Sequence, residues 1–386
     1  MLTARYALLQ SSYWGTFCLV ISFASVYMLA GGISNAEIGI VLAVAGLLSA
    51  VAQPVLAGAA ERSRRPLRVW IVVLGLVLAA AAVLLLVPGG SRLVTSLVYG
   101  FLIAAVQVVQ PLVNAVGMDA LNVGRRLNFG LARAAASLAF ALIAAVAGRV
   151  VEATSETAIP LIMLGVLAVF IASAGTFVVR SDGGSHDGDH HAAASGAVVA
   201  ARTSGDRARF VLLLAGLTLA MASHNLLNGF MFQLVSFHGA AASAMGVAIM
   251  IAALTELPTM GLWNRIVARW TPGLLLVVSG VAFAVKALAT YLAPNLLGIY
   301  LAQALQFAAF GLLVPASVYY INRLFPPSER VKGQAYMTMT ATAGSVVGSL
   351  AGGLVLQSAG VPSLLLLGVG FATVGAALTW AGANRA

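Results

Sequence analysis

Five titratable side chains interrupt long apolar stretches of this 386-residue chain, at Asp119, Arg133, His224, Glu256 and Lys286. A charge near the centre of a bilayer costs about 2.5–3.5 kcal/mol even on the lenient insertion scale, so such groups face one another or a water-filled cavity. Each half of the chain carries one acid and one base of the four charged residues. Carboxylates and histidine can exchange protons, and arginine or lysine can hold a hydroxyl or carboxylate of a solute. These residue types therefore suit reversible binding of protons and of a polar solute.

Amide side chains extend the polar pattern. Gln107, Gln110 and Asn114 are spaced i, i+3 and i+7, which places them on one face of a helix. Amides on a lipid-facing stripe are costly, so this face is expected to look inward. Interhelical hydrogen bonds without any solute account for a single amide equally well. Further amides lie in later apolar stretches, at Asn225, Asn228, Gln303 and Gln306.

A purely structural role for the four charges stays open. Asp119 with Arg133, and Glu256 with Lys286, would then be ion pairs that fasten helices together. We favour a solute site because a buried ion pair stabilises a fold less than apolar packing does.

Motifs for several other chemistries do not occur in the sequence. It has no Walker-type phosphate loop, no His-Glu-x-x-His and no cysteine-based metal pattern, so transport would draw on an ion or solute gradient. The run from His186 to His191 could bind a divalent ion, but such a run in a polar linker is more often solvated. We expect no metal and no cofactor. An intramembrane enzyme needs a nucleophile–base pair or a metal at one depth, and His224 beside Ser223 has no third group, so we expect no enzyme.

The elements that hold these residues are expected to be membrane-spanning helices. Hydrophobic residues make up 61% of the chain and charged residues 8%, against roughly 25% charge in soluble domains. A span needs about 20 apolar residues. Gly344, Gly348 and Gly352 have the spacing that allows close helix contact in lipid. The expected spans are 8–30, 35–60, 67–87, 92–120, 128–150, 158–179, 210–235, 243–263, 273–292, 296–320, 333–358 and 362–381.

The distribution of basic residues predicts the topology. Seventeen of the 21 Lys and Arg residues lie in or at the edges of alternate gaps between the apolar runs, and the other gaps carry only Arg92 and Arg149. Loops rich in Lys and Arg stay cytoplasmic, so twelve crossings with both termini inside satisfy the pattern. We expect a multi-pass protein of the plasma (inner) membrane. The net charge of +10 is scattered over short inner loops, which favours anionic lipid headgroups as partners and excludes nucleic acid.

One gap divides the spans six and six. The stretch between Arg180 and Arg209 is rich in Gly, Ser, Ala, Asp and His and cannot pack a core. The predicted fold is therefore an all-α membrane protein of twelve helices, arranged as two six-helix bundles around a central cavity. The N-terminal bundle covers residues 1–180, a flexible cytoplasmic linker 181–208, and the C-terminal bundle 209–386.

Several segments resemble the major facilitator superfamily. The stretch from Ile33 to Ile40, running on to Ser49 and Gln53-Pro54, is similar to the second helix of the lactose permease (oligosaccharide–proton symporter) branch. The loop from Glu61 to Arg65 resembles the acidic–basic loop after that helix, shortened by about a residue and with Glu for the usual Asp. This loop is widespread in the superfamily. The resemblance gives Glu61 and Arg62 a role at a cytoplasmic gate.

The segment from Arg125 to Arg133 is more specific, because it resembles the start of the fifth helix in the same branch. On that resemblance Arg133 stands where an arginine hydrogen-bonds sugar, Asp119 is its acidic partner, and Phe140 is the aromatic residue against which a sugar ring stacks. The second half is more similar to the phenylpropionate-permease-like branch, through Ala222-Ser223-His224, Glu256 and Lys286. Gln306 departs from the histidine of those relatives, and Ala309 stands where the lactose permease branch has its proton-carrying glutamate. The expected solute-binding residues are Arg133, Asp119, Phe140, Asn114, His224, Asn225, Lys286 and Gln306.

The resemblance and the residues together predict a secondary active transporter working by alternating access. We expect symport of protons with a small polar organic solute, a sugar or an organic acid such as an aromatic carboxylate. Glu256 is the first choice for the proton site, with Asp119 and His224 as further carriers. The alternative is a proton-driven exporter of drugs or metabolites, although the fifth span lacks the Gly-Pro typical of exporters. A non-transporting scaffold or sensor is a remote alternative. We expect a monomer.

Overall fold

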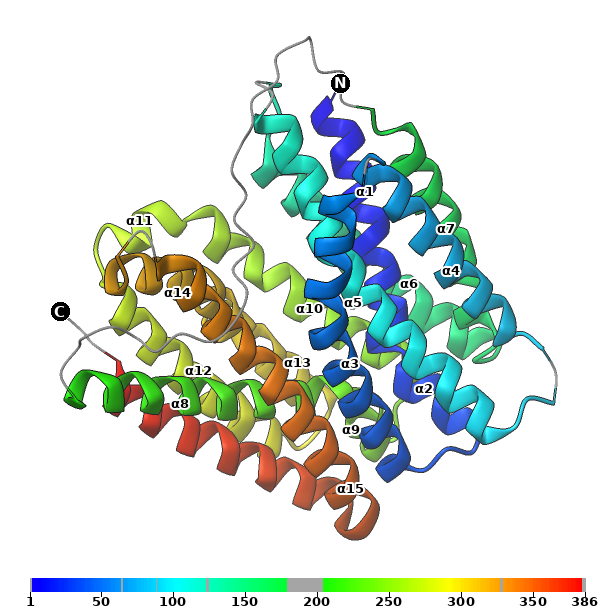
Figure 1. The fold of residues 1–386 in the computed structure, drawn as a ribbon. Coiled ribbons are helices and arrows are strands. Elements are labelled where there is room, and N and C mark those ends of the chain that lie inside the picture. Colours follow the sequence, from blue (N-terminus) through cyan, green and yellow to red (C-terminus); the bar gives the residue numbers. More distant parts are fainter. Residues whose placement is uncertain are drawn as a thin grey trace. The chain divides into compact units, whose positions relative to one another are not determined.

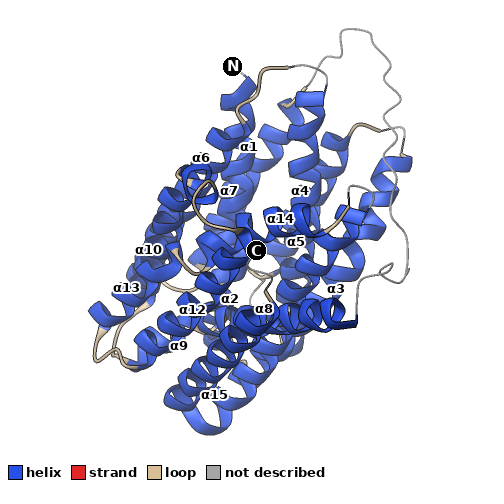
Figure 2. Ribbon diagram, turned by 90° about the vertical axis from the view of Figure 1, so that its left-hand side faces the viewer, coloured by secondary structure: helices blue, strands red, loops and turns tan. Residues whose placement is uncertain are grey.

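The computed structural model describes residues 2–63, 65–87, 89–122, 125–178, 204–326 and 329–383. Every regular element in this part of the chain is a helix, and no strand occurs in it (Figures 1 and 2). The prediction of an all-helical membrane protein is confirmed. The predicted linker, including its histidine run, lies outside the described residues as far as residue 203, and α8 begins at Ser204.

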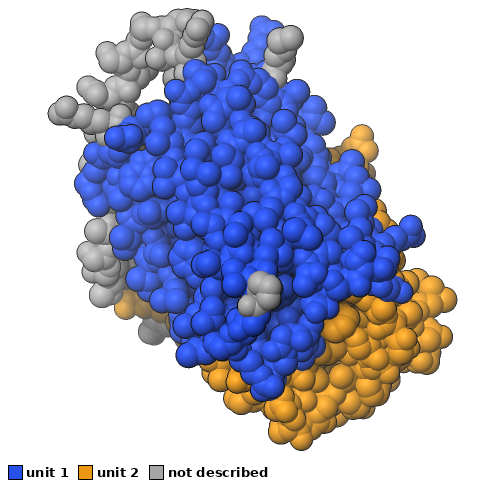
Figure 3. Space-filling view, turned by 90° about the vertical axis from the view of Figure 1, so that its right-hand side faces the viewer, with its two compact units in different colours: residues 1–34, 44–192 blue, residues 35–43, 193–386 orange. Residues whose placement is uncertain are grey.

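The described residues form two units, which Figure 3 colours separately. Unit 1 is drawn from residues 1–34 and 44–192, and unit 2 from 35–43 and 193–386. The start of α3 therefore groups with the second-half helices. The helices of the first half are α1 (Leu2–Phe17), the π-helix η1 (Cys18–Ser22), α2 (Ala24–Ala30), α3 (Asn35–Arg62), α4 (Leu67–Leu84), α5 (Arg92–Asn122), α6 (Phe129–Ala153) and α7 (Ala158–Thr176).

The second half begins with α8 (Ser204–Gly229) and α9 (Met231–Phe237). The remaining helices are α10 (Ala242–Gly261), α11 (Trp263–Val267), α12 (Pro272–Tyr291), α13 (Leu296–Ala304), the 3-10 helix η2 (Leu305–Phe307), α14 (Phe310–Leu324) and α15 (Arg330–Gly382). Helix ends follow ordinary capping chemistry. Asn128, Thr271 and Asn295 each accept a backbone N–H in the first turn of α6, α12 and α13.

The number of crossings depends on how broken helices are counted. Ten described helices are long and apolar enough to span a membrane, or eleven if α1, η1 and α2, bent by 44°, make one span. The 53 residues of α15 would extend about 80 Å, far beyond a hydrocarbon core of about 30 Å. Gly360 breaks this helix with φ 74° and ψ −175°, a conformation that only glycine adopts readily. The predicted count of twelve spans is therefore not matched exactly, although Gly360 divides α15 into two limbs.

The predicted glycine stripe packs α15 against α8 inside unit 2. A Cβ on Gly348 would fall on the backbone of Ala222, and one on Gly352 would meet the Phe230 ring. Gly344 faces Met221 and the Thr218 carbonyl in the same way. Small residues thus let two helix backbones approach closely, which is how helices associate in lipid.

Many large apolar side chains point away from the protein interior. Leu48, Val51, Leu97, Leu297 and Trp380 are each more than half exposed. A soluble monomer rarely shows so many, whereas a lipid-facing surface requires them.

Candidate functional site

A hydrogen-bonded chain of three polar side chains runs through unit 2. The Lys286 ammonium on α12 donates to Gln306 Oε1 at 2.5 Å, and Gln306 Nε2 donates to Glu256 Oε1 on α10 at 2.9 Å. Lys286 is 1% exposed and Gln306 4%, and Glu256 is half-buried. The structure therefore brings together three predicted residues from three different spans.

The orientation of Gln306 follows from its partners. A lysine ammonium only donates hydrogen bonds, so the amide oxygen must face Lys286. The amide nitrogen then faces Glu256, whose oxygen accepts. Because this arrangement satisfies an acid and a base through one amide, the charges need no direct contact.

The chain lies at a break in the span that contains Gln306. The helix stops at Ala304, passes through the 3-10 turn η2, and resumes as α14 at Phe310, with Ala309 at φ −78° and ψ −86°. Two carbonyls at the break accept side-chain hydroxyls: Phe307 O from Thr259 on α10 at 3.0 Å, and Ala309 O from Ser279 on α12 at 2.6 Å. Thus α10 and α12, which carry Glu256 and Lys286, also hold the break. The span predicted over residues 296–320 is present as Leu296–Leu324, with this break inside it.

His224 on α8 packs against two phenylalanine rings in the same unit. Its ring stacks on Phe310, with centroids 5.0 Å apart and planes within 11°, and meets Phe283 edge-on at 5.6 Å. The Asn228 amide nitrogen lies 3.0–3.1 Å from both ring nitrogens. Phe283 lies about one helical turn before Lys286 on α12, and Phe310 follows Gln306 by four residues across the break. The predicted Asn225 donates to the Met221 carbonyl of its own helix at 2.8 Å.

Unit 1 holds the predicted arginine over an aromatic ring. The Arg133 guanidinium carbon on α6 lies 4.0 Å from the centroid of Trp14 on α1. Phe17 and Tyr13 contact the indole at centroid distances of 5.0 and 5.5 Å. A cation over an indole face is an attractive arrangement that also fixes the direction of the guanidinium.

A second polar chain in unit 1 contains the predicted Asn114. Gln10 Nε2 on α1 lies 2.6 Å from the Tyr6 hydroxyl and 3.1 Å from Asn114 Oδ1, and donates to both oxygens. Tyr6 in turn donates to the Val113 carbonyl at 3.2 Å. Gln10 is fully buried and its own oxygen has no partner among the described residues.

The remaining predicted residues lie at separate positions on their helices. Asp119 is exposed near the end of α5, and Phe140 is half-buried on α6 two turns beyond Arg133. For the predicted gate, Arg62 is exposed at the last residue of α3, whereas the side chain of Glu61 lies outside the description. No group of three His, Cys, Asp or Glu residues in the described ranges is placed to hold a metal ion.

Sequence reasoning missed Trp14, Gln10 and Tyr6. Tyr6 and Gln10 are spaced i, i+4, so both lie on one face of the first span, and this polar spacing was a usable signal. Nothing in the local sequence distinguishes Trp14 from the other four tryptophans, because its role depends on Arg133 from a distant helix.

Comparisons with known proteins agree with this fold. A family model described as "MFS_1 like family" matches residues 5–365, so the chain belongs to this family of major facilitator transporters. It is 28% identical over 334 residues to the maltose permease of Geobacillus stearothermophilus, covering 84% of this chain and 80% of that protein. It is also 28% identical over 156 residues to the transporter YwbF of Bacillus subtilis (strain 168), covering 39% and 38% of the two chains.

Solved structures share the fold at low sequence identity. The nucleoside transporter NupG matches with a TM-score of 0.79 at 15% identity, covering 99% of this chain and 98% of that one. A POT family transporter in complex with a thioalcohol-conjugated peptide matches with a TM-score of 0.70 at 10% identity, covering 98% and 94%. The protein is thus a multi-pass membrane transporter of the major facilitator type and not an enzyme.

Proposed function

We propose that the protein is a secondary active transporter that takes up a small polar organic solute together with protons by alternating access. The observation that carries this proposal is the buried chain of Lys286, Gln306 and Glu256 at a helix break. Such a chain is a poor way to stabilise a fold. It is a good way to hold a carboxylate whose charge changes during a transport cycle.

Glu256 is the proposed proton carrier. It is the only acid of the chain of three, it is half-buried, and its ionised form accepts the Gln306 amide. Protonation removes the negative charge that balances Lys286 across Gln306, so proton binding changes the electrostatics of the whole cluster. His224 and Asp119 are further candidates for carrying protons.

Arg133 and Trp14 are proposed to bind the solute from unit 1. A guanidinium offers a planar fork of donors to a hydroxyl pair or a carboxylate, and an indole offers an apolar face to a ring. Lys286, Gln306, Asn114, Asn225, His224, Asp119 and Phe140 complete the proposed solute-binding set. The similarity to a maltose permease favours a sugar, with an organic acid as the second class.

The other expectations for the transporter stay part of the proposal. These are two six-helix bundles with a cytoplasmic linker, a gate at Glu61 and Arg62, cytoplasmic termini, the plasma membrane as location and a monomeric state. An exporter remains the rival function, and the direction of coupled flux separates the two.

A Glu256→Gln protein in proteoliposomes tests the proton carrier. We expect it to lose accumulation of solute driven by an inwardly directed proton gradient, because glutamine cannot take up a proton. It should retain exchange of labelled for unlabelled solute, since exchange needs no net proton movement. Glu152→Gln, an exposed acid near the end of α6, is the matched control and should accumulate solute normally. Gradient-driven uptake by Glu256→Gln with an unchanged pH dependence would remove Glu256 from the role.

The solute class is tested by thermal unfolding of the purified protein with sugars, nucleosides and aromatic acids. A ligand at 100 times its dissociation constant adds about 2.7 kcal/mol to the native state. We expect one class to raise the unfolding temperature and Arg133→Ala to remove that effect. If only apolar compounds stabilise the protein, the exporter becomes the better account.

A further inference from the structure

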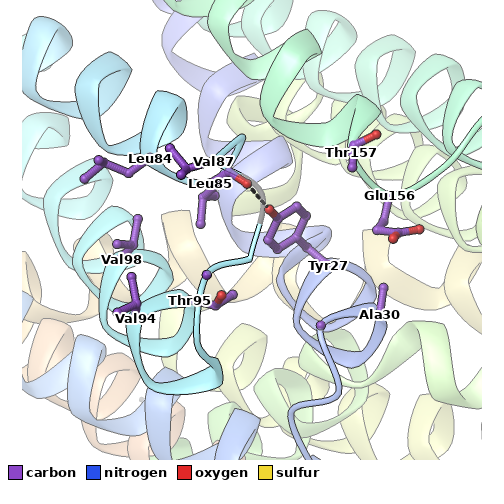
Figure 4. A pocket seen from close by; sticks show the side chains of 12 residues that line it. Tyr27, Ala30, Leu84, Leu85, Val87, Val94, Thr95, Val98, Glu156 and Thr157 are labelled. Carbon is purple, nitrogen blue, oxygen red and sulfur yellow. Dashed lines mark hydrogen bonds between the residues drawn. The ribbon is translucent and has the colours of Figure 1, made fainter.

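Unit 1 contains a cavity built from residues other than those proposed to bind the solute. It has a volume of about 180 Å3. Its walls come from the end of α2, the end of α4, the start of α5 and the connection between α6 and α7 (Figure 4). These connections belong to the gaps poor in basic residues, so the charge distribution places the cavity toward the outside.

The lining combines an apolar wall with one acid. Leu84, Leu85, Val94 and Val98 supply apolar surface, and Glu156 supplies a half-buried carboxylate. No lining residue among those described carries a positive charge, and the nearby Arg92 guanidinium lies against Gly32, beside the lining residue Gly31. A carboxylate partly removed from water among apolar side chains favours a cationic ligand and disfavours an anionic one.

Tyr27 gives the cavity a fixed aromatic ring. Its hydroxyl donates to the Leu85 carbonyl at 2.5 Å, and its ring packs on the fully buried Tyr99 ring at a centroid distance of 5.6 Å. Figure 4 shows Glu156 on the side of the Tyr27 ring opposite to Leu85. Because the hydroxyl is already bonded to the backbone, the ring has little freedom to turn away from the cavity.

We propose that this cavity binds a small organic ammonium group, with Glu156 as its counter-ion and Tyr27 as its aromatic contact. An aromatic face attracts ammonium groups, most strongly where water is partly excluded, and a carboxylate adds a charge-assisted interaction. The hydroxyls of Thr95 and Thr157 can serve N–H donors or a hydroxyl on the ligand. The ligand is either a free small amine or the headgroup of an amine-bearing lipid.

Binding here would connect segments of unit 1 that lie on either side of a bend in the first span. The end of α2 follows the π-helix η1, where the first span bends by 44°. An ammonium held between Tyr27 on α2 and Glu156 before α7 connects the segment beyond this bend to the rest of the unit. The proposal is independent of the solute and proton sites in Arg133 and Glu256.

The test uses the full-length protein in a detergent without amine groups, with tetramethylammonium chloride and ethanolammonium chloride as probes. At equal ionic strength, we expect each probe to raise the unfolding temperature above that measured with sodium chloride. The apparent dissociation constant should rise at least about tenfold in Glu156→Gln and in Tyr27→Leu. Glu152→Gln, changed outside the cavity, should respond as the unaltered protein does. No stabilisation by either probe, or an equal response in Glu156→Gln, would overturn the proposal.

Lipid nanodiscs separate the two sources of the ammonium group. In discs of phosphatidylglycerol with phosphatidylethanolamine, a lipid occupant would raise the unfolding temperature and abolish the further effect of tetramethylammonium. With a free amine as the occupant, tetramethylammonium would act equally in discs with and without phosphatidylethanolamine. Each of these two results supports the site if the effect on the unfolding temperature is lost in Glu156→Gln. An effect of phosphatidylethanolamine that persists in Glu156→Gln counts against a lipid in this cavity.

Discussion

At the scale of single residues, Trp14 is the main addition to the proposed solute site. The resemblance to known permeases indicated Phe140, on the same helix as Arg133, as the ring that faces a sugar. In the structure the guanidinium of Arg133 lies over Trp14 from another helix, at 4.0 Å from the ring centroid. The aromatic contact in unit 1 is therefore formed between α1 and α6.

We expect Trp14→Ala to weaken solute binding about tenfold, because it removes both the ring contact and the support for the Arg133 guanidinium. Trp14→Phe should retain most of the affinity, since a phenyl ring keeps an apolar face. The measurement is the KM of uptake for each variant, with Trp270→Ala, an exposed residue after α11, as control. Equal KM values for Trp14→Ala and the unaltered protein would show that the indole does not contact solute.

Lys286 and Glu256 are expected to depend on each other through Gln306. Lys286→Met leaves the amide oxygen of Gln306 without its charged donor in a buried position, which costs about 1.5–3 kcal/mol. Adding Glu256→Gln removes the negative charge that Lys286 no longer balances, so the double variant should regain part of the lost stability. Thermal unfolding of both single variants and the double variant measures this. Strict additivity of the two losses would mean that the acid and the base are not coupled.

Some of these residue contacts could be predicted and others could not. Charges within apolar spans are costly, so Glu256, Lys286 and Arg133 could be found from the sequence alone. The bridging position of Gln306 could not, because it depends on how α10, α12 and the break meet in space. The Trp14 contact likewise joins residues 119 positions apart in the chain.

At the scale of helices, glycine residues explain both the close packing of α15 on α8 and the turn between the last two spans. The stripe of Gly344, Gly348 and Gly352 was predicted from its spacing, and it packs on α8 as expected. The boundary between the last two spans was also predicted, and Gly360 makes it. By contrast, no local sequence feature predicts the break at η2. Thr259 and Ser279, on neighbouring helices, donate hydrogen bonds to the carbonyls at this break.

Gly348→Leu should destabilise the protein because its side chain would collide with the backbone of Ala222, and overpacking of this kind costs about 1–3 kcal/mol. Gly370→Leu is the matched control on the same helix, since a side chain there meets open space. It should leave stability unchanged or raise it, because leucine favours helix more than glycine does. The two variants are compared by their unfolding temperatures in the same detergent. Equal losses in the two variants would contradict the packing of α8 on α15.

At the scale of the whole molecule, the number of helices and their apolar surfaces follow from composition and charge spacing. Apolar runs of span length and alternating basic loops predicted the multi-pass fold, which the family membership and the shared fold with NupG confirm. Neither kind of pattern identifies the solute, because binding depends on a few side chains whose positions are set by packing. Coupling to protons has to be measured.

The most direct test of proton-coupled uptake is proton flux caused by solute. Proteoliposomes are equilibrated without any gradient, the solute identified by thermal unfolding is added outside, and external pH is recorded. Symport predicts that the outside becomes more alkaline as protons enter with the solute, and that Glu256→Gln abolishes the change. Acidification of the outside, or solute uptake with no change in pH, would contradict the account.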